Sequence, residues 1–221
     1  MIKLWGLAIT LGIFIVVLKL KNYKFIGKIP PTVIVGILLI TILKVFNIDY
    51  ASYNESACVL TILLGPATIA LAYPLVENLK LLTQNKRAVY FGLVIATITA
   101  LTVTMIIGKV FHTDIQIVTS LMPKSVTTPI AVEISKVIGG IPELTACMVV
   151  LTGIYGAIFG HKILQLLKIK SDIAKGLAIG SASHVLGTST CVNKRKQLVM
   201  ATLALILTGV LTTVVCILLW G

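Results

Sequence analysis

Long apolar runs without a charged side chain dominate the chain. Such runs cover residues 56–76, 88–108, 144–160 and 197–221. Two shorter runs, at 4–18 and 29–43, are flanked by lysines whose long stems can reach the lipid headgroups and extend a span. About 20 apolar residues cross a hydrocarbon core of ~30 Å. The pattern therefore predicts an all-α polytopic membrane protein.

Three segments interrupt this regular pattern. Residues 116–138 contain two prolines and a lysine, and residues 173–190 are rich in glycine, serine and threonine. The segment at 57–79 is expected to be interrupted at Gly65-Pro66 and again at Pro74, because proline in a helix interior removes a backbone hydrogen bond. Non-helical backbone at membrane depth is tolerated only where it is buried in protein or lines a water-filled cavity. These segments are therefore the first candidates for a functional site.

Composition and charge agree with a membrane protein. The chain has 57% hydrophobic and 12% charged residues, whereas soluble domains average about 45–50% and about 25%. The net charge of +12 comes mostly from lysine and arginine in short loops at residues 19–28, 80–87, 162–175 and 194–196. Short loops of this kind stay in the cytoplasm. The positions of the basic residues therefore indicate which loops face the cytoplasm, and they do not point to a nucleic-acid partner. With these loops inside, the N-terminus and the C-terminus are expected outside the cell membrane.

Two topologies fit these loops. If residues 116–138 and 173–190 both cross fully, the chain has eight spans and the lysine-rich loop at 162–175 lies outside. If both are broken or re-entrant, the chain has six full spans and that loop lies inside, as the positive-inside bias favours. The chain is expected to form one transmembrane domain, residues 1–221. A weak repeat of the pattern Gly-x-Ala-[Ser/Thr]-x-x-Leu raises the possibility of two halves, 1–112 and 113–221.

The first candidate site is the string from Met122 to Pro129. Pro123 and Pro129 are expected to break the helix and free backbone carbonyls. A half-helix beginning near Pro129 would aim free N–H groups and its positive dipole end at the break. The expected substrate-binding side chains here are Lys124, Ser125, Thr127 and Thr128. Together they describe a cradle for an anion, although Lys124 could instead reach an interface or pair with Glu133.

Glu133 follows this break and stands three residues before Lys136. One interpretation is an ion pair on the helix surface at i, i+3. The other is a titrating carboxylate whose proton moves with the substrate. Both stay open at this point.

The second candidate site is the string from Gly180 to Thr188. Gly180 and Gly187 are expected to break the helix, while Ser181, Ser183 and His184 offer hydrogen bonds to a carboxylate or a hydroxyl. The ordinary pKa of histidine, ~6.5, also suits proton coupling. The alternative for His184 is a packed structural histidine.

Catalysis and bound cofactors are not expected. The four cysteines are widely spaced and indicate neither a disulfide framework nor a metal site. Ser183 and His184 are adjacent, which is poor geometry for a base to activate a nucleophile. The sequence therefore predicts no enzyme, no cofactor and no metal.

Three strings resemble the LrgB/CidB family of antiholin-like or holin-like membrane proteins. They are residues 65–74, residues 122–131 and residues 176–188, of which the Pro-Lys-Ser-Val-Thr-Thr-Pro string is the most specific. The resemblance covers essentially the whole chain. The basic stretch at 189–196 departs from many relatives, which continue with alanine and acidic residues there.

The resemblance implies two different functions. Bacterial members are named for modulating murein hydrolase activity and cell lysis, usually beside a smaller LrgA/CidA-like membrane subunit. The plastid glycolate/glycerate translocator, which is similar to a fusion of the two parts, implies transport of small 2-hydroxy or 2-keto acids such as glycolate, glycerate or pyruvate. The family strings fall on the predicted breaks, which favours a transporter for small monocarboxylates. The alternative is a holin/antiholin-like regulator, and a homo-oligomer is expected in either case.

The expected cradle combines segments 63–74, 122–133 and 180–188, with Thr68 contributed by the first. Lys124 and the helix N-termini would bind the carboxylate, while Ser181, Ser183 and His184 would address the 2-hydroxyl or 2-keto oxygen. Rocking of the broken segments against the clean spans would alternate access.

Overall fold

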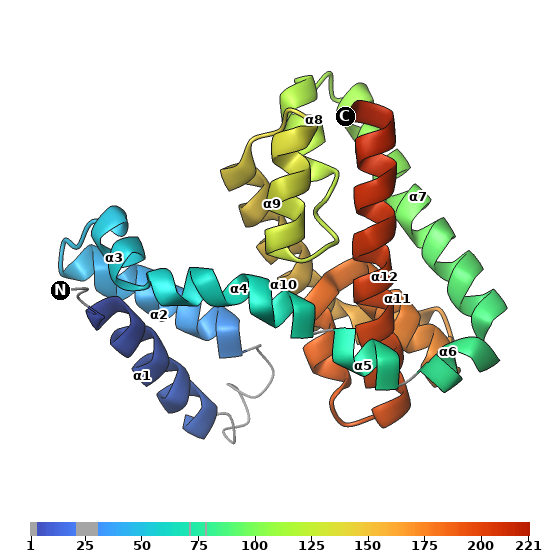
Figure 1. Cartoon of the computed structure of the whole chain (residues 1–221), viewed down its shortest axis with the longest axis horizontal. Helices are drawn as coiled ribbons and strands as arrows, with labels where there is room; N and C mark the ends of the chain where they lie inside the picture. Colours follow the sequence, from blue (N-terminus) through green and yellow to red (C-terminus); the bar gives the residue numbers. More distant parts are fainter. Residues whose placement is uncertain (1–3, 21–30, 71, 78) are drawn as a thin grey trace. The chain divides into compact units, whose positions relative to one another are not determined.

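The computed structural model describes residues 4–20, 31–70, 72–77 and 79–221, and within these ranges the regular structure is entirely helical. The chain forms two compact units, residues 1–70 and 71–221 (Figure 1). Each unit is described by itself.

The described residues of unit 1 form four helices: α1 (Trp5–Leu20), α2 (Pro31–Val45), α3 (Tyr50–Ser56) and α4 (Cys58–Ala70). The carboxylate of Asp49 starts α3 by accepting a hydrogen bond from the backbone N–H of Ala51 at 3.0 Å. Side-chain contacts then fix α1 against α3, since Thr10 Oγ1 lies 2.8 Å from the hydroxyl of Tyr53. Unit 1 is thus a small helical group held partly by polar contacts.

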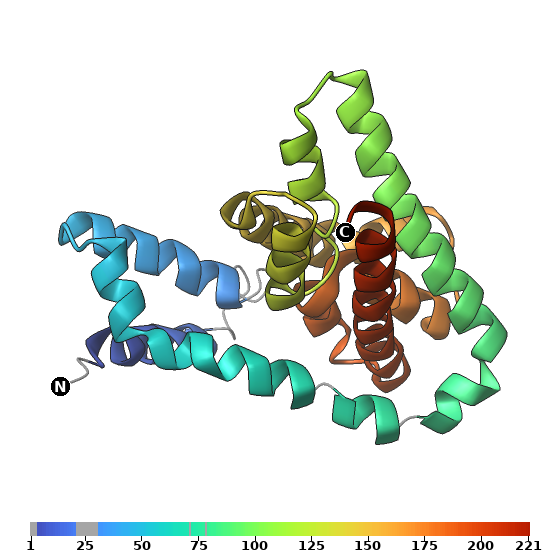
Figure 2. The same ribbon diagram turned by 45° about the horizontal axis from the view of Figure 1, so that its top comes forward.

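Unit 2 contains the rest of the chain. Its helices are α5 (Ala72–Glu77), α6 (Leu79–Gln84), α7 (Lys86–Val110), α8 (Ile115–Leu121), α9 (Thr128–Val137), α10 (Pro142–Leu166), α11 (Asp172–Thr188) and α12 (Arg195–Trp220), with a 3-10 turn η2 (Ser189–Cys191) before α12. Helix α12, drawn in red, lies between α7 and α9 in both views (Figure 1, Figure 2).

Three helices of unit 2 are long and apolar enough to cross a membrane: α7, α10 and α12, with 25, 25 and 26 residues. At a rise of 1.5 Å per residue each is about 38 Å long, more than the ~30 Å hydrocarbon core requires. Helices α1 and α2 of unit 1 are shorter apolar helices. The described part of the chain is therefore an all-helical membrane protein, as predicted, while the number of crossings stays a prediction.

The segment at 115–137, which we call hairpin A, doubles back on itself. The chain runs through α8, turns at residues 122–127 and returns through α9. After α9 the backbone N–H of Ile141 donates to Ser120 Oγ at 2.7 Å, and the hydroxyl of Thr145 lies 2.9 Å from Ser120 O. The chain therefore leaves α9 at the level where it left α8. This geometry fits the broken, re-entrant alternative.

The segment at 172–191, which we call hairpin B, also doubles back. Ser183 and His184 depart from helical geometry, with φ −135°, ψ 16° and φ 41°, ψ −138°. Asp172, at the start of hairpin B, accepts a hydrogen bond at 2.7 Å from Gln197 Nε2, which follows its end. Both ends of hairpin B therefore lie at the same level of unit 2, and α11 is broken at Ser183 and His184.

The expected interruption at Gly65-Pro66 is wrong. Pro66 lies inside α4, which continues to Ala70. Prolines are tolerated in membrane helices because other groups satisfy the freed carbonyl. Pro74 is the third residue of α5, where a backbone N–H has no partner within the helix to lose. Positions 71 and 78, which stand between α4, α5 and α6, lie outside the described residues.

The expected breaks at Gly180 and Gly187 are also wrong, because hairpin B turns between them. A Cβ built on Gly180 would overlap the backbone of Ala201, and one on Gly187 would lie 2.5 Å from Ser183 Cβ. Both glycines therefore permit close packing, Gly180 against α12 and Gly187 against the turn itself.

Candidate functional site

The turn of hairpin A, residues 122–127, is buried although it is not helical. Met122 and Val126 are each 1% exposed, and Ser125 and Thr127 are also buried. Thr127 has an extended backbone and precedes α9, in which Pro129 occupies one of the first positions. The predicted half-helix near Pro129 is therefore confirmed, with its N-terminus at the buried turn.

Lys124 is the only basic residue of this turn, and its amine bonds to a hydroxyl and not to an acid. Lys124 Nζ donates to Thr104 Oγ1 on α7. The hydroxyl of Thr104 in turn donates to Ala100 O at 2.8 Å. Within the described ranges the structure pairs Lys124 with no carboxylate. A half-buried ammonium without a counter-ion favours the binding of an anion.

Three buried hydroxyls have no hydrogen-bond partner among the described residues: those of Thr127 in this turn, Thr97 on α7 and Thr208 on α12. We call them the hydroxyl layer. On α7, Thr97 lies between Leu93 and Leu101, which belong to two different apolar clusters. Thr208 lies between the α12 members of the same two clusters. Each of these two hydroxyls therefore interrupts an otherwise apolar core along its helix.

The N-terminus of α9 belongs to the same neighbourhood. A Cβ built on Gly209 would lie 3.3 Å from Ile130 Cδ1, so the first turn of α9 touches α12 next to Thr208. Buried polar groups without partners cost free energy, on the order of 1–3 kcal/mol each. Groups of this kind are typical of a site that receives a polar ligand or water.

The turn of hairpin B carries backbone strain. His184 has φ 41° and ψ −138°, a conformation that side-chain-bearing residues rarely adopt. Such residues cost about 1–3 kcal/mol and persist only when their surroundings hold them in place. Two hydrogen bonds contribute: His184 Nε2 donates to Val149 O at 2.9 Å, and Thr188 Oγ1 donates to His184 O at 2.8 Å. Because a carbonyl oxygen only accepts, the ring carries its proton on Nε2.

Glycines on α10 make room for this turn. A Cβ on Gly153 would lie 2.6 Å from His184 Cε1, and a Cβ on Gly156 would overlap Ser183 Oγ. Gly160, one turn further, faces only Ile179 Cγ1 at 3.8 Å. The spacing Gly156-x-x-x-Gly160 is thus a packing pattern, and its first member admits Ser183.

The two turns lie against the same part of α10. Val149 accepts the hydrogen bond from His184 and also packs in one apolar cluster with Met122 and Val126 of hairpin A. The side chains of Lys124 and His184 nevertheless face different helices, since Lys124 bonds to α7 and His184 to α10.

Other predicted site residues have ordinary partners in this structure. The hydroxyl of Ser181 donates to Leu177 O at 2.7 Å within its own helix. Thr128 is half-buried in the first turn of α9. Glu133 accepts from Lys136 Nζ at 2.7 Å, and both side chains are more than half exposed. The ion-pair interpretation of Glu133 therefore describes this geometry, and its role in proton coupling stays a prediction.

The boundary between the two units falls inside segment 63–74. The segment is therefore described apart from the turns of hairpins A and B. Thr68 lies within α4, and its side chain is outside the described part of the chain. Its role in substrate binding stays a prediction, like those of the other candidate residues.

Sequence reasoning missed Thr104 and the hydroxyl layer on α7 and α12. A signal was present, because Thr97, Leu101, Thr104 and Gly108 repeat every three or four residues along a helix that is otherwise apolar. Hydroxyls on the inward stripe of a membrane helix point to polar contacts inside the protein.

The family comparison agrees with the strings at these turns. The model of the LrgB-like family matches residues 10–221. The chain belongs to this family. Relatives include an antiholin-like protein LrgB of Bacillus subtilis (strain 168), 30% identical over 213 residues, covering 96% of this chain and 92% of the relative. The antiholin-like protein LrgB of Bacillus mycoides is 33% identical over 199 residues, covering 90% of this chain and 86% of the relative.

A third relative, the uncharacterized protein YxaC of Bacillus subtilis (strain 168), is 32% identical over 181 residues, which are 82% of this chain and 79% of the relative. No solved structure matches the chain. This LrgB-like chain is therefore a membrane protein whose named relatives are described as antiholin-like.

Proposed function

We propose that this LrgB-like protein is a membrane transporter, or the main subunit of one, for small monocarboxylates such as 2-hydroxy or 2-keto acids. The observation that carries the proposal is the pair of buried turns in hairpins A and B. They bring an ammonium without a counter-ion and a strained histidine to the two sides of one packed core. Interrupted helices of this kind are the usual binding elements of secondary transporters.

The chemistry of hairpin A supports an acidic substrate. A carboxylate at the turn would accept hydrogen bonds from Lys124 Nζ and from hydroxyls of the hydroxyl layer. The N-terminus of α9, a helix of 10 residues, adds a positive dipole end. Lys124 would exchange its bond to Thr104 for one to the substrate.

The chemistry of hairpin B supports recognition of a second group of the substrate, its 2-hydroxyl or 2-keto oxygen. His184 holds Val149 O through Nε2, which leaves Nδ1 for a ligand. Neutral Nδ1 would accept from a 2-hydroxyl group, and protonated Nδ1 would donate to a 2-keto oxygen. Ser183, beside it in the turn, adds a hydroxyl.

The test is uptake of radiolabelled pyruvate, glycolate and glycerate into proteoliposomes, with an unrelated sugar as the control solute. We expect saturable uptake of at least one acid and exclusion of the sugar. The Lys124→Ala and His184→Ala variants should each raise KM about tenfold or more, as expected for a lost hydrogen bond to a charged group. Lys162→Ala, at an exposed lysine of α10, is the matched control and should transport normally. Unchanged uptake in both site variants would contradict the proposal.

The second candidate is an antiholin-like regulator of murein hydrolase activity and cell lysis. The names of the relatives support it more directly than transport, because none of them mentions a solute. In bacterial cells this function predicts that the lysis rate follows the amount of protein and does not respond to Lys124→Ala. Passage of acid and sugar alike in proteoliposomes would indicate a pore.

A smaller LrgA/CidA-like subunit and self-association remain part of the proposal. The uptake experiment is therefore run with and without such a subunit. Uptake that requires the subunit would make this chain one part of a two-component carrier. No passage in either arrangement would leave regulation as the better explanation.

A further inference from the structure

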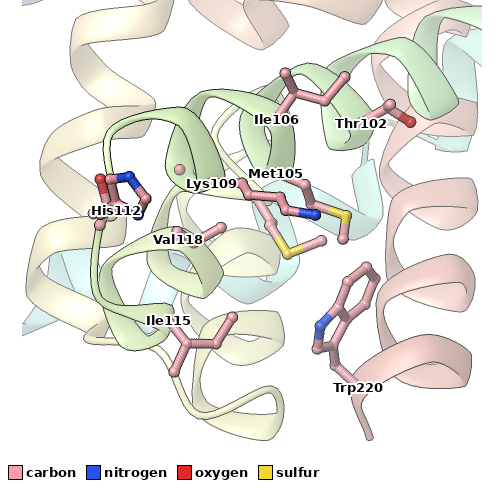
Figure 3. A pocket seen from close by; sticks show the side chains of 11 residues that line it. Thr102, Met105, Ile106, Lys109, His112, Ile115, Val118 and Trp220 are labelled. Carbon is pink, nitrogen blue, oxygen red and sulfur yellow. The ribbon is translucent and has the colours of Figure 1, made fainter.

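A pocket of about 580 Å³ opens where α7, α8 and α12 come together. Its walls are mostly apolar and include Met105, Ile106, Val118 and Trp220, and Met122 of the hairpin A turn also lines it. Figure 3 shows the amine of Lys109 directed into the pocket beside Met105, above the indole ring of Trp220 in this view. The pocket thus combines apolar walls with one cationic group.

The charge at this pocket is positive. Within the described ranges Lys109 forms no ion pair, and His112 also lines the pocket. The neighbouring acid, Asp114, caps α8 instead, because its carboxylate accepts from the backbone N–H of Gln116 at 2.7 Å. An anionic group in the pocket would therefore meet the ammonium of Lys109.

The position of the pocket is that of a membrane interface. Helices α7 and α12, both long enough to span a bilayer, end at Val110 and Trp220 beside it. Tryptophan at the end of a span is typical of the headgroup level. The volume lies in the range of pockets that hold drug-sized ligands, so a small carboxylate would leave most of it unfilled.

We infer that this pocket binds an anionic phospholipid, with the phosphate at Lys109 and an acyl chain along Met105, Ile106 and Trp220. The inference does not depend on the proposed transport activity. It makes hairpin A sensitive to the lipid, since Met122 lines the pocket and Lys124 follows two residues later.

Trp220 provides a reporter at the site, because the chain has only two tryptophans. The full chain carrying Trp5→Phe is reconstituted into vesicles of equal parts phosphatidylglycerol and phosphatidylcholine. In one sample only phosphatidylglycerol is brominated, and in the other only phosphatidylcholine, so that the surface charge is the same. Quenching of Trp220 fluorescence then measures which lipid occupies the pocket.

We expect phosphatidylglycerol to be preferred on the order of fivefold, which is what one lysine near an anionic surface supplies. Lys109→Gln should bring the ratio close to one, Lys109→Arg should restore it, and Lys86→Gln, at the opposite end of α7, should leave it unchanged. Equal quenching by both lipids before mutation would overturn the inference. So would an unchanged ratio in Lys109→Gln, or quenching by neither lipid, which would mean that another protein surface covers the pocket.

Discussion

The strained backbone at His184 is the clearest functional signal at the scale of single residues. A glycine would adopt φ 41° without cost, yet the chain has a histidine there. The conformation is maintained by the hydrogen bond to Val149 O and by Gly153 and Gly156, which leave space for the turn. Strain kept in a buried polar residue is typical of binding sites.

We expect Gly156→Ala to destabilise the protein by about 1–3 kcal/mol, because the added methyl group overlaps Ser183 Oγ. The matched control is Gly160→Ala on the same helix, whose new Cβ would meet its nearest neighbour at 3.8 Å and should be close to neutral. Thermal unfolding in detergent measures both. Adding Ser183→Gly to Gly156→Ala should restore most of the loss. If the two alanine variants unfolded at the same temperature, the turn of hairpin B would be able to shift and accommodate the added methyl group.

The second prediction at the residue scale concerns the loss of the hydroxyl that accepts the hydrogen bond from Lys124. Thr104→Val keeps the shape of the side chain but leaves the ammonium without its acceptor, at a cost of about 1–3 kcal/mol. For a chain of this size the unfolding temperature should fall by about 2–12 °C. Thr99→Val, on the exposed side of α7, is the control and should change it little. A Thr104→Val protein as stable as the control would mean that Lys124 has another acceptor.

At the scale of elements, the sequence predicted hairpin A better than hairpin B. Pro123 and Pro129 both disfavour a continuous helix between them, so the turn at 122–127 could be located from them. In hairpin B the glycines drew attention, but Gly180 packs against α12 and the turn falls on Ser183 and His184. A tertiary contact with α10 decides that position, and a single sequence does not reveal it.

The polar contacts that close hairpin A should act as one unit. The hydroxyl of Thr145 lies 2.7 Å from Ser135 Oγ and 2.9 Å from Ser120 O, while Ser120 Oγ accepts from the N–H of Ile141. Ser120→Ala and Thr145→Val should therefore be non-additive, with a coupling of about 0.5–3 kcal/mol in a double-mutant cycle of unfolding free energies. The pair Ser120→Ala and Thr99→Val serves as the uncoupled reference. If the free-energy changes of the first pair were additive, the two hydroxyls would not act together in closing hairpin A.

At the scale of the whole molecule, the returning hairpins decide which loops share a side of the membrane. Asp172 bonds to Gln197 and lies 4.0 Å from Lys194 Nζ, so the loops before and after hairpin B lie together. In hairpin A the chain after α9 likewise returns to Ser120 near the end of α8, where the N–H of Ile141 donates to Ser120 Oγ. If α10 and α12 each cross the membrane, this arrangement puts the loops at 162–175 and 194–196 on one side, as the positive-inside bias predicts.

Cysteine labelling can test this arrangement in the intact membrane. With the four native cysteines replaced by serine or alanine, Lys170→Cys and Lys194→Cys should react with an impermeant maleimide from the same side. Thr113→Cys and Glu143→Cys should both react from the opposite side, because hairpin A also returns to the side it started from. If segments 116–138 and 173–190 crossed fully, each pair would instead be divided between the two sides. The hairpins would then belong to a different state of the protein, and the counterion-free lysine and the strained histidine would have to be placed anew.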